Sequence, residues 1–524
     1  MCERLKYIKD NNIPITIYPD FDTDGVSSGI VGFAGLAELG FYVNLYIPDP
    51  ARGYGITVDS IKDLLSQYPD TKAIITCDTG IGAYEAMDYC NSIGVEMLVT
   101  DHHIQSAVGH ASVIVDPLRM DESYTHPAIC GAFVFQQVLQ YYADHYTDYF
   151  MQTQIERLRV FAGIGTISDT MPVLYENRRL VRDSVNICKW LFGDSTDQAV
   201  STIVGSNAYR RAFWGLYTFM KVCESNGIIN SDKDINEDFF GFYLAPMVNS
   251  VKRMNGDMAK AFGAFLGNTP REDSEYLYKL NVDRKEAVEL EFKDMMSAHQ
   301  PYAPYIYLST ANAGIVGLLA MKVLNATGRP AFVLVSQPDG TLSGSGRCPA
   351  WYTFSEKEKT LMWMAGHAGA FGCGCASLQD LSDFYDELDA NVTSTMATME
   401  VVQQTYDFVI STDWSADIGI DMHVFREYID EIETYRPFGT QFPAPCAKFV
   451  FWNKDVIEWK KMGKAGQHLK LSFANGFSLI CWNQGHLISE KDKSDYHEVS
   501  GHLATSVFRG EEMINFIGTF EVAV

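Results

Sequence analysis

The chain has 524 residues, more than a single hydrophobic core usually serves, so we expect two to four domains. Hydrophobic residues make up 47% and charged residues 20% of the chain, a globular composition that excludes an intrinsically disordered protein. Lys and Arg number 41 against 66 Asp and Glu, and the formal charge of −25 argues against a protein that coats nucleic acid through phosphate contacts. This charge leaves open a nuclease with a local basic groove around a cationic metal centre.

Export and membrane insertion find no support in the sequence. Residues 1–6 lead directly into polar sequence without a signal-peptide pattern. The most apolar helical stretch, residues 313–324, contains Lys322 and is too short to span a bilayer. The 11 cysteines lack a disulfide spacing, and the close pair Cys373 and Cys375 suits packing better than metal binding. We therefore expect a cytoplasmic protein without a membrane partner.

Short apolar runs alternate with amphipathic segments between residues 13 and 117. The predicted strands are residues 15–18, 42–47, 73–77, 95–99 and 112–115, and the predicted helices are residues 26–39, 57–66 and 82–92. This alternation predicts a mostly parallel sheet. The sequence is then helical in character from residue 131 to about residue 168.

The remainder of the chain changes character twice. A mainly helical region extends to about residue 270, and residues 273–297 predict a long connecting helix with a solvated, charged face. A second α/β segment follows, with strands at residues 305–309 and 332–335 and a helix at residues 314–325. After about residue 400 the pattern predicts a small β-barrel or sandwich, with strands at residues 447–452, 468–473, 477–481 and 513–522.

Acidic residues and histidines follow three of the predicted strands in the first sheet. They are Asp20, Asp22 and Asp24 after the first strand, Asp78 after the third, and Asp101, His102 and His103 after the fourth, while Asp169 follows a glycine-rich helical segment. Because the carboxyl ends of parallel strands open onto one crevice, these side chains can converge. Carboxylates gathered in this way repel one another unless a cation neutralises them. Oxygen ligands with added imidazole suit Mn²⁺ or a similar divalent cation, so the pattern predicts a metal site for phosphate chemistry.

Turn formation, helix capping and solvated histidines are the alternative explanation of these residues. For a single such cluster this explanation would be preferred. Three strand ends with the same chemistry, together with Asp169, favour the metal site. Two metal ions about 3.5–4 Å apart could share a hydroxide nucleophile and stabilise the leaving oxygen.

Four segments resemble the motifs of the DHH phosphoesterases and, within them, the RecJ-like single-strand-specific DNA exonucleases. These segments are residues 20–25, 78–80, 101–103 and 165–169. Further segments resemble the family in the same order along nearly the whole chain, and they are residues 50–55, 171–178, 246–250, 280–284, 314–317, 344–347, 366–368, 437–439 and 468–471. The resemblance implies an α/β fold in four parts: a parallel-sheet DHH phosphoesterase domain (1–185), a helical region and connecting helix (186–299), an α/β DHH-associated substrate-binding domain (300–398) and an OB-like, nucleic-acid-binding β-barrel (399–524).

The resemblance also implies which residues bind metal and act in catalysis. Two divalent cations, preferably Mn²⁺ or else Mg²⁺, would be bound by Asp22, Asp24, Asp78, His102 and Asp169, with Asp20 joining or orienting these ligands. Asp101 would position the ligand loop from behind. His103 would contact the scissile phosphate and so belong, with the five principal ligands, to the catalytic residues.

Substrate contacts are implied on the other side of the site. Arg347 and His367 would hold the substrate phosphate from the DHH-associated domain, a role that suits a fork-shaped guanidinium. Arg52, Asn249 and Arg253 are further candidates. For each of these three, a surface salt bridge or a helix cap is a serious alternative.

The function that the resemblance implies is a metal-dependent single-stranded DNA exonuclease. It would work 5′→3′, release 5′-mononucleotides and act in DNA recombination, repair or replication as a monomer, with a single-strand-binding protein or a helicase as candidate partner. A phosphodiesterase of short oligonucleotides or cyclic dinucleotides is the alternative, which the net charge favours and the C-terminal β domain opposes. A non-catalytic replication scaffold of the Cdc45 kind should have lost metal ligands, whereas this chain retains them.

Two departures from the family pattern bear on the site. Tyr18 stands where some DHH proteins carry a histidine, four residues before Asp22, so one metal ion would be held less tightly. Met247 stands where RecJ-like proteins usually carry arginine, which removes one expected phosphate contact. Both would suit a divergent member, such as a phage-encoded one, with altered substrate handling.

Overall fold

The computed structural model describes residues 1–49, 55–105, 109–121, 123–193, 201–398, 405–412, 418–463, 466–482, 484–485, 496–508 and 511–520. The chain divides into two compact units, one formed by Met1–Thr398 with Gly439–Gln441 and the other by Met399–Phe438 with Phe442–Val524. Within the described parts of both units, no helix is long and apolar enough to cross a membrane.

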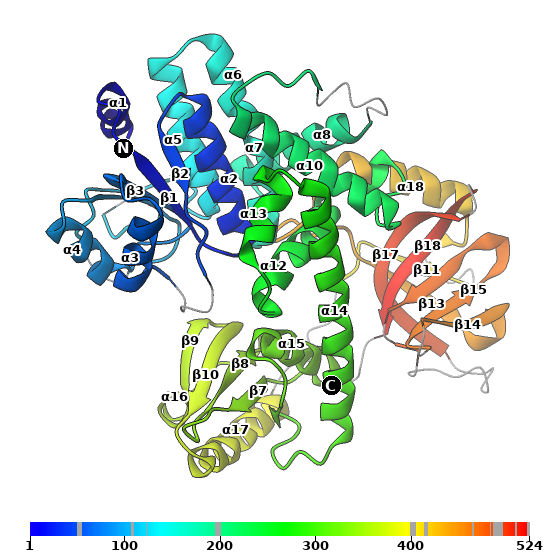
Figure 1. Ribbon diagram of the computed structural model, residues 1–524. Coiled ribbons are helices and arrows are strands. Elements are labelled where there is room, and N and C mark those ends of the chain that lie inside the picture. Colours follow the sequence, from blue (N-terminus) through cyan, green and yellow to red (C-terminus); the bar gives the residue numbers. More distant parts are fainter. Residues whose placement is uncertain are drawn as a thin grey trace. The chain divides into compact units, whose positions relative to one another are not determined.

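The predicted parallel sheet lies in the first unit (Figure 1). Its strands are β1 (Ile15–Pro19), β2 (Val43–Leu45), β3 (Ala73–Cys77), β4 (Glu96–Thr100) and β5 (Val113–Val115), in the order β2-β1-β3-β4-β5 with every neighbouring pair parallel. The chain passes from β1 to β2 on one side and returns to β3 on the other. This reversal creates a topological switch point at the carboxyl ends of β1 and β3, where ligands bind in open α/β sheets.

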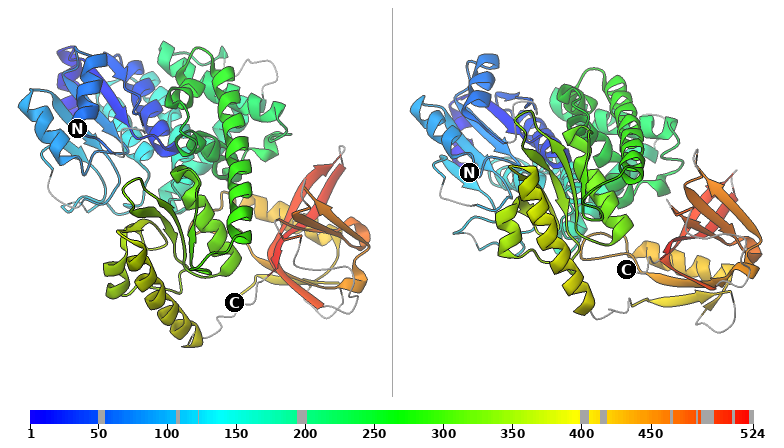
Figure 2. Two further views of the ribbon diagram at one scale, coloured as in Figure 1. Left: turned by 60° about the horizontal axis from the view of Figure 1, so that its bottom comes forward. Right: turned by 90° about the horizontal axis from the view of Figure 1, so that it is seen from below.

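Helices cover both faces of this sheet (Figures 1 and 2). One face carries α2 (Thr23–Glu38) and α5 (Gly131–Tyr146), and the other carries α3 (Val58–Gln67) and α4 (Tyr84–Ser92). Side chains alternate along each strand, so Ile17 and Ile75 pack toward α2 and α5 while Tyr18 and Ile74 pack toward α3 and α4. Burial on both faces explains why β1 and β3 are continuous apolar runs.

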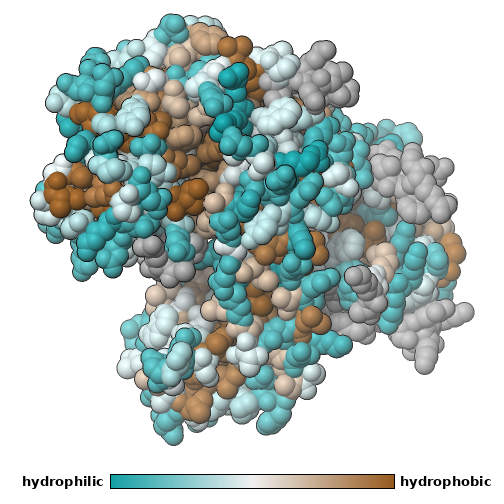
Figure 3. Space-filling view, viewed as in Figure 1, coloured by the Kyte–Doolittle hydropathy of each residue, from teal (hydrophilic) through white to brown (hydrophobic). Residues whose placement is uncertain are grey.

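A helical region follows the sheet and leads into a long helix. Together with the N-terminal α1 (Cys2–Asp10), the helices are α6 (Tyr149–Arg157), α7 (Arg159–Ser168), α8 (Tyr175–Gly193), α10 (Asn207–Ser225), α11 (Glu237–Phe239), the π-helical turn η3 (Phe240–Leu244), α12 (Ala245–Arg253), α13 (Met258–Leu266) and α14 (Pro270–Ser297). The predicted connecting helix is α14. It begins at Pro270 rather than at residue 273, because proline suits the first helical position. Its buried residues Leu277, Arg284 and Val288 form one stripe along the helix. The face of the molecule shown in Figure 3 is mostly hydrophilic.

The first unit also contains a second sheet. Its strands are β6 (Ile306–Leu308), β7 (Ala331–Ser336), β8 (Leu342–Arg347), β9 (Trp363–His367) and β10 (Ala370–Cys375), in the order β6-β7-β8-β10-β9, and its helices are η4 (Ala313–Ile315), α15 (Val316–Thr327), α16 (Glu356–Leu361) and α17 (Leu378–Thr398). Only β6 and β7 are parallel neighbours. Helix α15 packs on one face and α17 on the other. Cys373 and Cys375 of β10 are buried in the hydrophobic cluster between this sheet and α17.

The second unit is the predicted β domain with one added helix. It contains β11 (Phe408–Ser411), β12 (Ile418–Gly419), α18 (Met422–Thr434), β13 (Ala447–Trp452), β14 (Glu458–Met462), β15 (His468–Ser472), β16 (Ser478–Cys481), β17 (Tyr496–Phe508) and β18 (Glu511–Phe520), in the strand order β12-β11-β13-β17-β18-β16-β15-β14. Phe449, Phe477 and Phe516 form its core, and Phe425 of α18 packs against them. Helix α18 is not among the elements expected from the sequence.

Candidate metal centre

The loop after β1 presents three aspartates within five residues. Asp22 caps α2, because its Oδ1 accepts a hydrogen bond of 2.9 Å from the N–H of Gly25. A side chain at position 25 would collide with the backbone of Asp20, since a Cβ there would lie 2.4 Å from its carbonyl carbon. Glycine therefore allows the tight turn that brings Asp20, Asp22 and Asp24 to the end of β1.

Asp24 is held by the first turn of another helix. Its Oδ2 accepts a hydrogen bond from the N–H of Gly131 at 2.7 Å and its Oδ1 one from Ala132 at 3.1 Å. These N–H groups belong to the start of α5, whose N-cap residue provides no side-chain cap. Glycines allow helices α5 and α7 to pack closely against the proposed ligands. A Cβ at Gly131 of α5 would lie 2.5 Å from the Cβ of Asp78, and a Cβ at Gly165 of α7 would lie 2.2 Å from Oδ1 of Asp24. The glycine-rich segment before Asp169 thus packs directly against the ligand cluster.

Asp78 follows β3 in an unusual backbone conformation. Its φ of 62° lies in the left-handed region, which residues with a Cβ rarely adopt. Its side chain is buried, and its Oδ1 forms no hydrogen bond among the described residues, although Nε2 of His102 lies 3.0 Å away. Buried carboxylate oxygens are normally satisfied, so this atom indicates a ligand position.

His102 lies at the centre of the converging carboxylates. Its Nε2 is 3.0 Å from Oδ1 of Asp78, 3.6 Å from Oδ2 of Asp169 and 3.8 Å from Oδ2 of Asp24. Three overlapping groups of potential ligands have donor atoms within 4.8 Å of one another, and they are Asp78 with His102 and His103, Asp24 with His102 and Asp169, and Asp20 with Asp22 and Asp78. The structure therefore brings all the predicted ligands into one cluster.

The charges of this cluster are poorly balanced within the protein. Burial, followed by repulsion from neighbouring carboxylates, raises the pKa of Asp24 and of Asp78, raises that of Asp20 to about 7 and raises that of Asp169 to about 8. Burial lowers the pKa of His102, which favours the neutral imidazole that coordinates metals. A divalent cation would relieve this repulsion, and the oxygen-rich donor set with one imidazole suits it.

Asp101 lies behind the cluster and organises the histidine loop. Its carboxylate accepts hydrogen bonds from the N–H groups of Ile81 (2.9 Å), His102 (2.7 Å) and His103 (3.2 Å), and its Oδ1 is 2.7 Å from Nδ1 of His103. Burial raises the pKa of Asp101, but these donors outweigh it and the pKa is lowered. The hydrogen bond to Asp101 raises the pKa of His103 to about 9, so His103 carries a positive charge at neutral pH.

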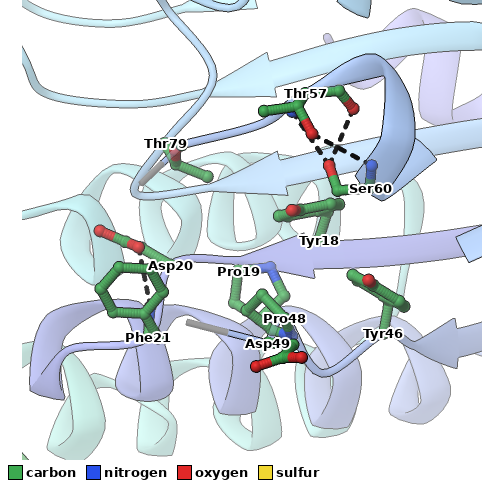
Figure 4. Close-up of a pocket in the computed structure, with 11 residues that line it drawn as sticks. Tyr18, Pro19, Asp20, Phe21, Tyr46, Pro48, Asp49, Thr57, Ser60 and Thr79 are labelled. Carbon is green, nitrogen blue, oxygen red and sulfur yellow. Dashed lines mark hydrogen bonds between the residues drawn. The ribbon is translucent and has the colours of Figure 1, made fainter. Parts of the chain in front are cut away.

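Tyr18 occupies the position where some DHH proteins have a histidine. Figure 4 shows it in β1 beside Tyr46, and the two rings lie 5.0 Å apart. The same view shows Asp20 accepting a hydrogen bond of 2.9 Å from the N–H of Phe21. Tyr18 packs in the core between the sheet and α3 and α4, and it lines a pocket together with Asp20.

Two family models match the chain. The N-terminal domain of the DHH family matches residues 14–164, and the RecJ OB domain matches residues 417–518. The chain therefore contains a DHH-family domain and a RecJ-type OB domain.

Known RecJ proteins are similar to this RecJ-like chain over most of its length. The single-stranded-DNA-specific exonuclease RecJ of Bacillus subtilis is 26% identical over 93% of the chain, and that of Thermus thermophilus is 24% identical over 95%. The chain spans 58% and 66% of the length of these two relatives. The crystal structure of Thermus thermophilus RecJ in complex with Mn²⁺ matches with a TM-score of 0.69 at 20% identity, over 99% of this chain and 70% of that one. This match confirms the predicted fold class.

Three guanidinium groups lie near one another in the RecJ-like chain. Burial lowers the pKa of Arg253, and the positive charge of Arg347 lowers it further, while the carboxylate of Asp22 opposes this. Burial and the charge of Arg253 lower the pKa of Arg284 to about 10. Among the described residues none of the three arginines forms an ion pair with a carboxylate, and the buried Nε of Arg347 has no partner. The cluster is suited to an anion, and Arg284 is a member that the sequence analysis did not identify.

The remaining predicted substrate residues are placed differently. Oδ1 of Asn249 accepts hydrogen bonds of 2.9 Å from both the N–H and the Oγ1 of Thr23, so Asn249 caps α2, the alternative considered above. His367 lies exposed on β9 and is not part of the converging groups. Met247 is buried in α12 and cannot replace the expected arginine. Arg52 lies outside the described residues.

Two charged residues near the centre were also missed by the sequence analysis. Asp116 follows β5 as the ligands follow β1, β3 and β4, and the same strand-end rule would have found it. Burial raises its pKa to about 6. The Nζ of Lys252 lies 3.9 Å from the ring centroid of Phe21, between the loop aspartates, and no sequence pattern indicated this contact.

Proposed function

We propose that this RecJ-like chain is a metal-dependent exonuclease that hydrolyses single-stranded DNA from the 5′ end and releases 5′-mononucleotides. The observation that carries the proposal is the convergence of buried carboxylates on His102, whose Nε2 lies 3.0 Å from an Oδ1 of Asp78 that forms no hydrogen bond among the described residues. The names of the curated relatives support the substrate class. The chain spans 58% of the length of the Bacillus subtilis relative, and the activity of that whole protein is proposed for this chain.

The ligand set would hold two divalent cations, Mn²⁺ or Mg²⁺, both of which occur in complexes of Thermus thermophilus RecJ. The proposed ligands are Asp22, Asp24, Asp78, His102 and Asp169, with Asp20 assisting. Bound cations would lower the pKa of water and stabilise the leaving oxygen. Asp101 would fix the ligand loop through its three N–H donors.

The cationic residues would hold the strand. His103 is positively charged and half exposed, and Asp101 fixes its Nδ1, so its Nε2–H can donate to a phosphate oxygen as negative charge develops. Arg347, Arg253 and Arg284 would bind the adjacent phosphate, because charge-assisted guanidinium contacts are strong. Asn249 would act as a positioning residue through its cap on α2.

The proposed activity gives each part of the chain a role. We propose that residues 1–185 carry the chemistry, that residues 186–299 connect it to a substrate-binding part at 300–398, and that the OB-type part at 399–524 binds the strand further from the cut. A monomer working in the cytoplasm on recombination, repair or replication substrates, beside a single-strand-binding protein or a helicase, fits this division. OB folds bind single strands by stacking and backbone contacts.

Labelled DNA tests the proposal directly. Single strands labelled at the 5′ or 3′ end are incubated with Mn²⁺, Mg²⁺ or EDTA, and duplex DNA is compared. We expect mononucleotides from the 5′ end of single strands only, with loss of activity in EDTA and in Asp78→Asn. Asp59→Asn is the matched control, because Asp59 is exposed on α3.

Other outcomes would redirect the proposal. Release from the 3′ end would contradict the polarity, and equal cleavage of duplex would contradict the substrate. Cleavage of dinucleotides without cleavage of long strands would favour the short-oligonucleotide phosphodiesterase. Strand binding without any metal-dependent hydrolysis would favour a scaffold.

A further inference from the structure

A cavity of about 210 Å³ in the first unit is lined by two chain segments that lead to the metal centre. Residues 125–129 run toward Gly131, whose N–H binds Asp24, and residues 172–177 follow Asp169. At 3.8 Å per residue, the Cα atom of Ile129 lies within roughly 8 Å of that of Gly131, and Pro172 within roughly 11 Å of Asp169. The cavity is therefore within reach of a strand whose phosphate occupies the metal centre.

An aromatic pair forms one wall of this cavity. The rings of His126 and Tyr175 are stacked, with centroids 4.3 Å apart and an interplanar angle of 16°. Residue Tyr175 is 69% exposed, so its ring remains accessible to a ligand. The pair is a flat surface on which another planar ring can stack.

The backbone of Tyr175 is strained. Its φ of 46° lies in the left-handed region, where a bulky residue is a genuine outlier, and Gln441 in the same cavity has a φ of 62°. An exposed tyrosine contributes little to the core, so the core does not account for an aromatic residue in a conformation that glycine adopts without penalty. Strain of this kind collects at ligand sites.

The chemistry of the cavity suits a neutral ring rather than a phosphate. No Lys or Arg is among its lining residues in the described part of the chain, and Glu176 lies at its rim, where its Oε2 accepts a hydrogen bond from Tyr124 at 2.8 Å. A phosphate would be repelled by this carboxylate. The volume is below the roughly 300 Å³ at which sites for drug-sized ligands begin, so one planar ring fits better than a whole nucleotide.

We propose that His126 and Tyr175 form a stacking subsite for one nucleobase of the DNA strand, near the scissile phosphate. This inference rests on the proposed exonuclease function and adds a position at which the strand is held by a base. Since every base presents a π-face, the subsite would tolerate any sequence. It would cooperate with the phosphate contacts of Arg253 and Arg347.

Single-turnover and steady-state cleavage of 5′-labelled oligonucleotides tests the subsite. One series carries a single abasic position at each of the first four nucleotides. In the wild-type protein, one abasic position should raise KM by about 5- to 100-fold, the size expected for one base–aromatic stack, with little change in kcat. Tyr175→Gly should raise KM to the same extent on intact DNA and should lose the sensitivity to that abasic position. Tyr175→Phe retains the aromatic face and should therefore retain the sensitivity to that abasic position.

Stability separates stacking from a structural role. Because glycine adopts the left-handed conformation freely, Tyr175→Gly should not lower the thermal midpoint of unfolding. A lowered midpoint, an unchanged KM or retained sensitivity to every abasic position would overturn the subsite. If the wild type cleaves no DNA, the exonuclease proposal fails. Equilibrium binding of the abasic series to Asp78→Asn, with and without Tyr175→Gly, then still decides the stacking subsite.

Discussion

Individual carboxylates at the carboxyl end of the first sheet differ in the number of hydrogen bonds that they accept. Asp101 is surrounded by hydrogen-bond donors, whereas Asp116 is 3% exposed and its Oδ2 has no partner among the described residues. Burial is the main reason that the pKa of Asp116 rises from 3.8 to about 6. The folded state thus binds a proton at Asp116 more tightly than the unfolded state does. Its ionisation therefore opposes folding as pH rises from about 4 to 6, and this destabilisation is fully present above pH 6.

Replacing this carboxyl by an amide should remove that penalty. We expect Asp116→Asn to raise the free energy of unfolding by about 1 to 3 kcal/mol at pH 7.5, because the amide retains the acceptor for Leu118 without a buried charge. At pH 4 the gain should largely vanish. Urea unfolding of both proteins at the two pH values measures it, with Asp59→Asn as the exposed control. An equal gain at both pH values would show that the stabilisation does not come from ionisation.

At the scale of elements, the site depends on how closely α5 approaches β3. The first residue of α5 is Gly131, and an added Cβ there would lie 2.5 Å from both Cβ and Oδ1 of Asp78 and 2.8 Å from its Cα. The Cα atom is backbone and cannot rotate away. The helix would have to withdraw, and its N–H groups would then leave Asp24.

We therefore expect Gly131→Ala to weaken Mn²⁺ binding by at least tenfold and to destabilise the protein by about 1 to 3 kcal/mol, as overpacking does in well-packed cores. Isothermal titration with Mn²⁺ and thermal unfolding measure the two effects. Gly82→Ala is the control, because a Cβ at Gly82 meets no atom within 4 Å. Unchanged Mn²⁺ affinity in Gly131→Ala would mean that the contact between α5 and Asp78 does not position the ligands.

Sequence patterns predicted some of the strands and missed others. The strands that end in ligands were predictable, because buried parallel strands are continuous apolar runs and their polar ends are conspicuous. Strands β8 and β10 were missed because alternating glycines hide the β pattern, and Gly344 allows a close approach in which a Cβ would lie 2.0 Å from the carbonyl oxygen of Val333. Local patterns carry no information about contacts between distant segments. Asn249 caps a residue 226 positions away, and Arg284 meets Arg253 across two helices.

At the scale of the whole molecule, the two units have separate hydrophobic cores. All the converging ligands belong to the first unit. A ligand that binds only the folded form stabilises that form by about 2.7 kcal/mol when its concentration is 100 times its dissociation constant. Mn²⁺ should therefore stabilise one unit and leave the other unaffected.

Calorimetry should resolve this difference. We expect two unfolding transitions, and saturating Mn²⁺ should raise the midpoint of the one that belongs to the first unit by about 3 °C for each ion bound. EDTA should reverse the shift, and Asp78→Asn should abolish it. Equal shifts of both transitions would contradict this assignment.

Asp22 and Asp24 each perform two tasks, since both are proposed ligands and both accept hydrogen bonds from the first turn of a helix. A lineage that no longer needed catalysis would still be under selection to keep these two carboxylates for the sake of folding. Asp169, with its side chain 33% exposed, has no such second role in the described structure. Descendants that lose catalysis should therefore lose Asp169 early and Asp24 late. The order in which the ligands are lost would then record when catalysis ceased to be selected.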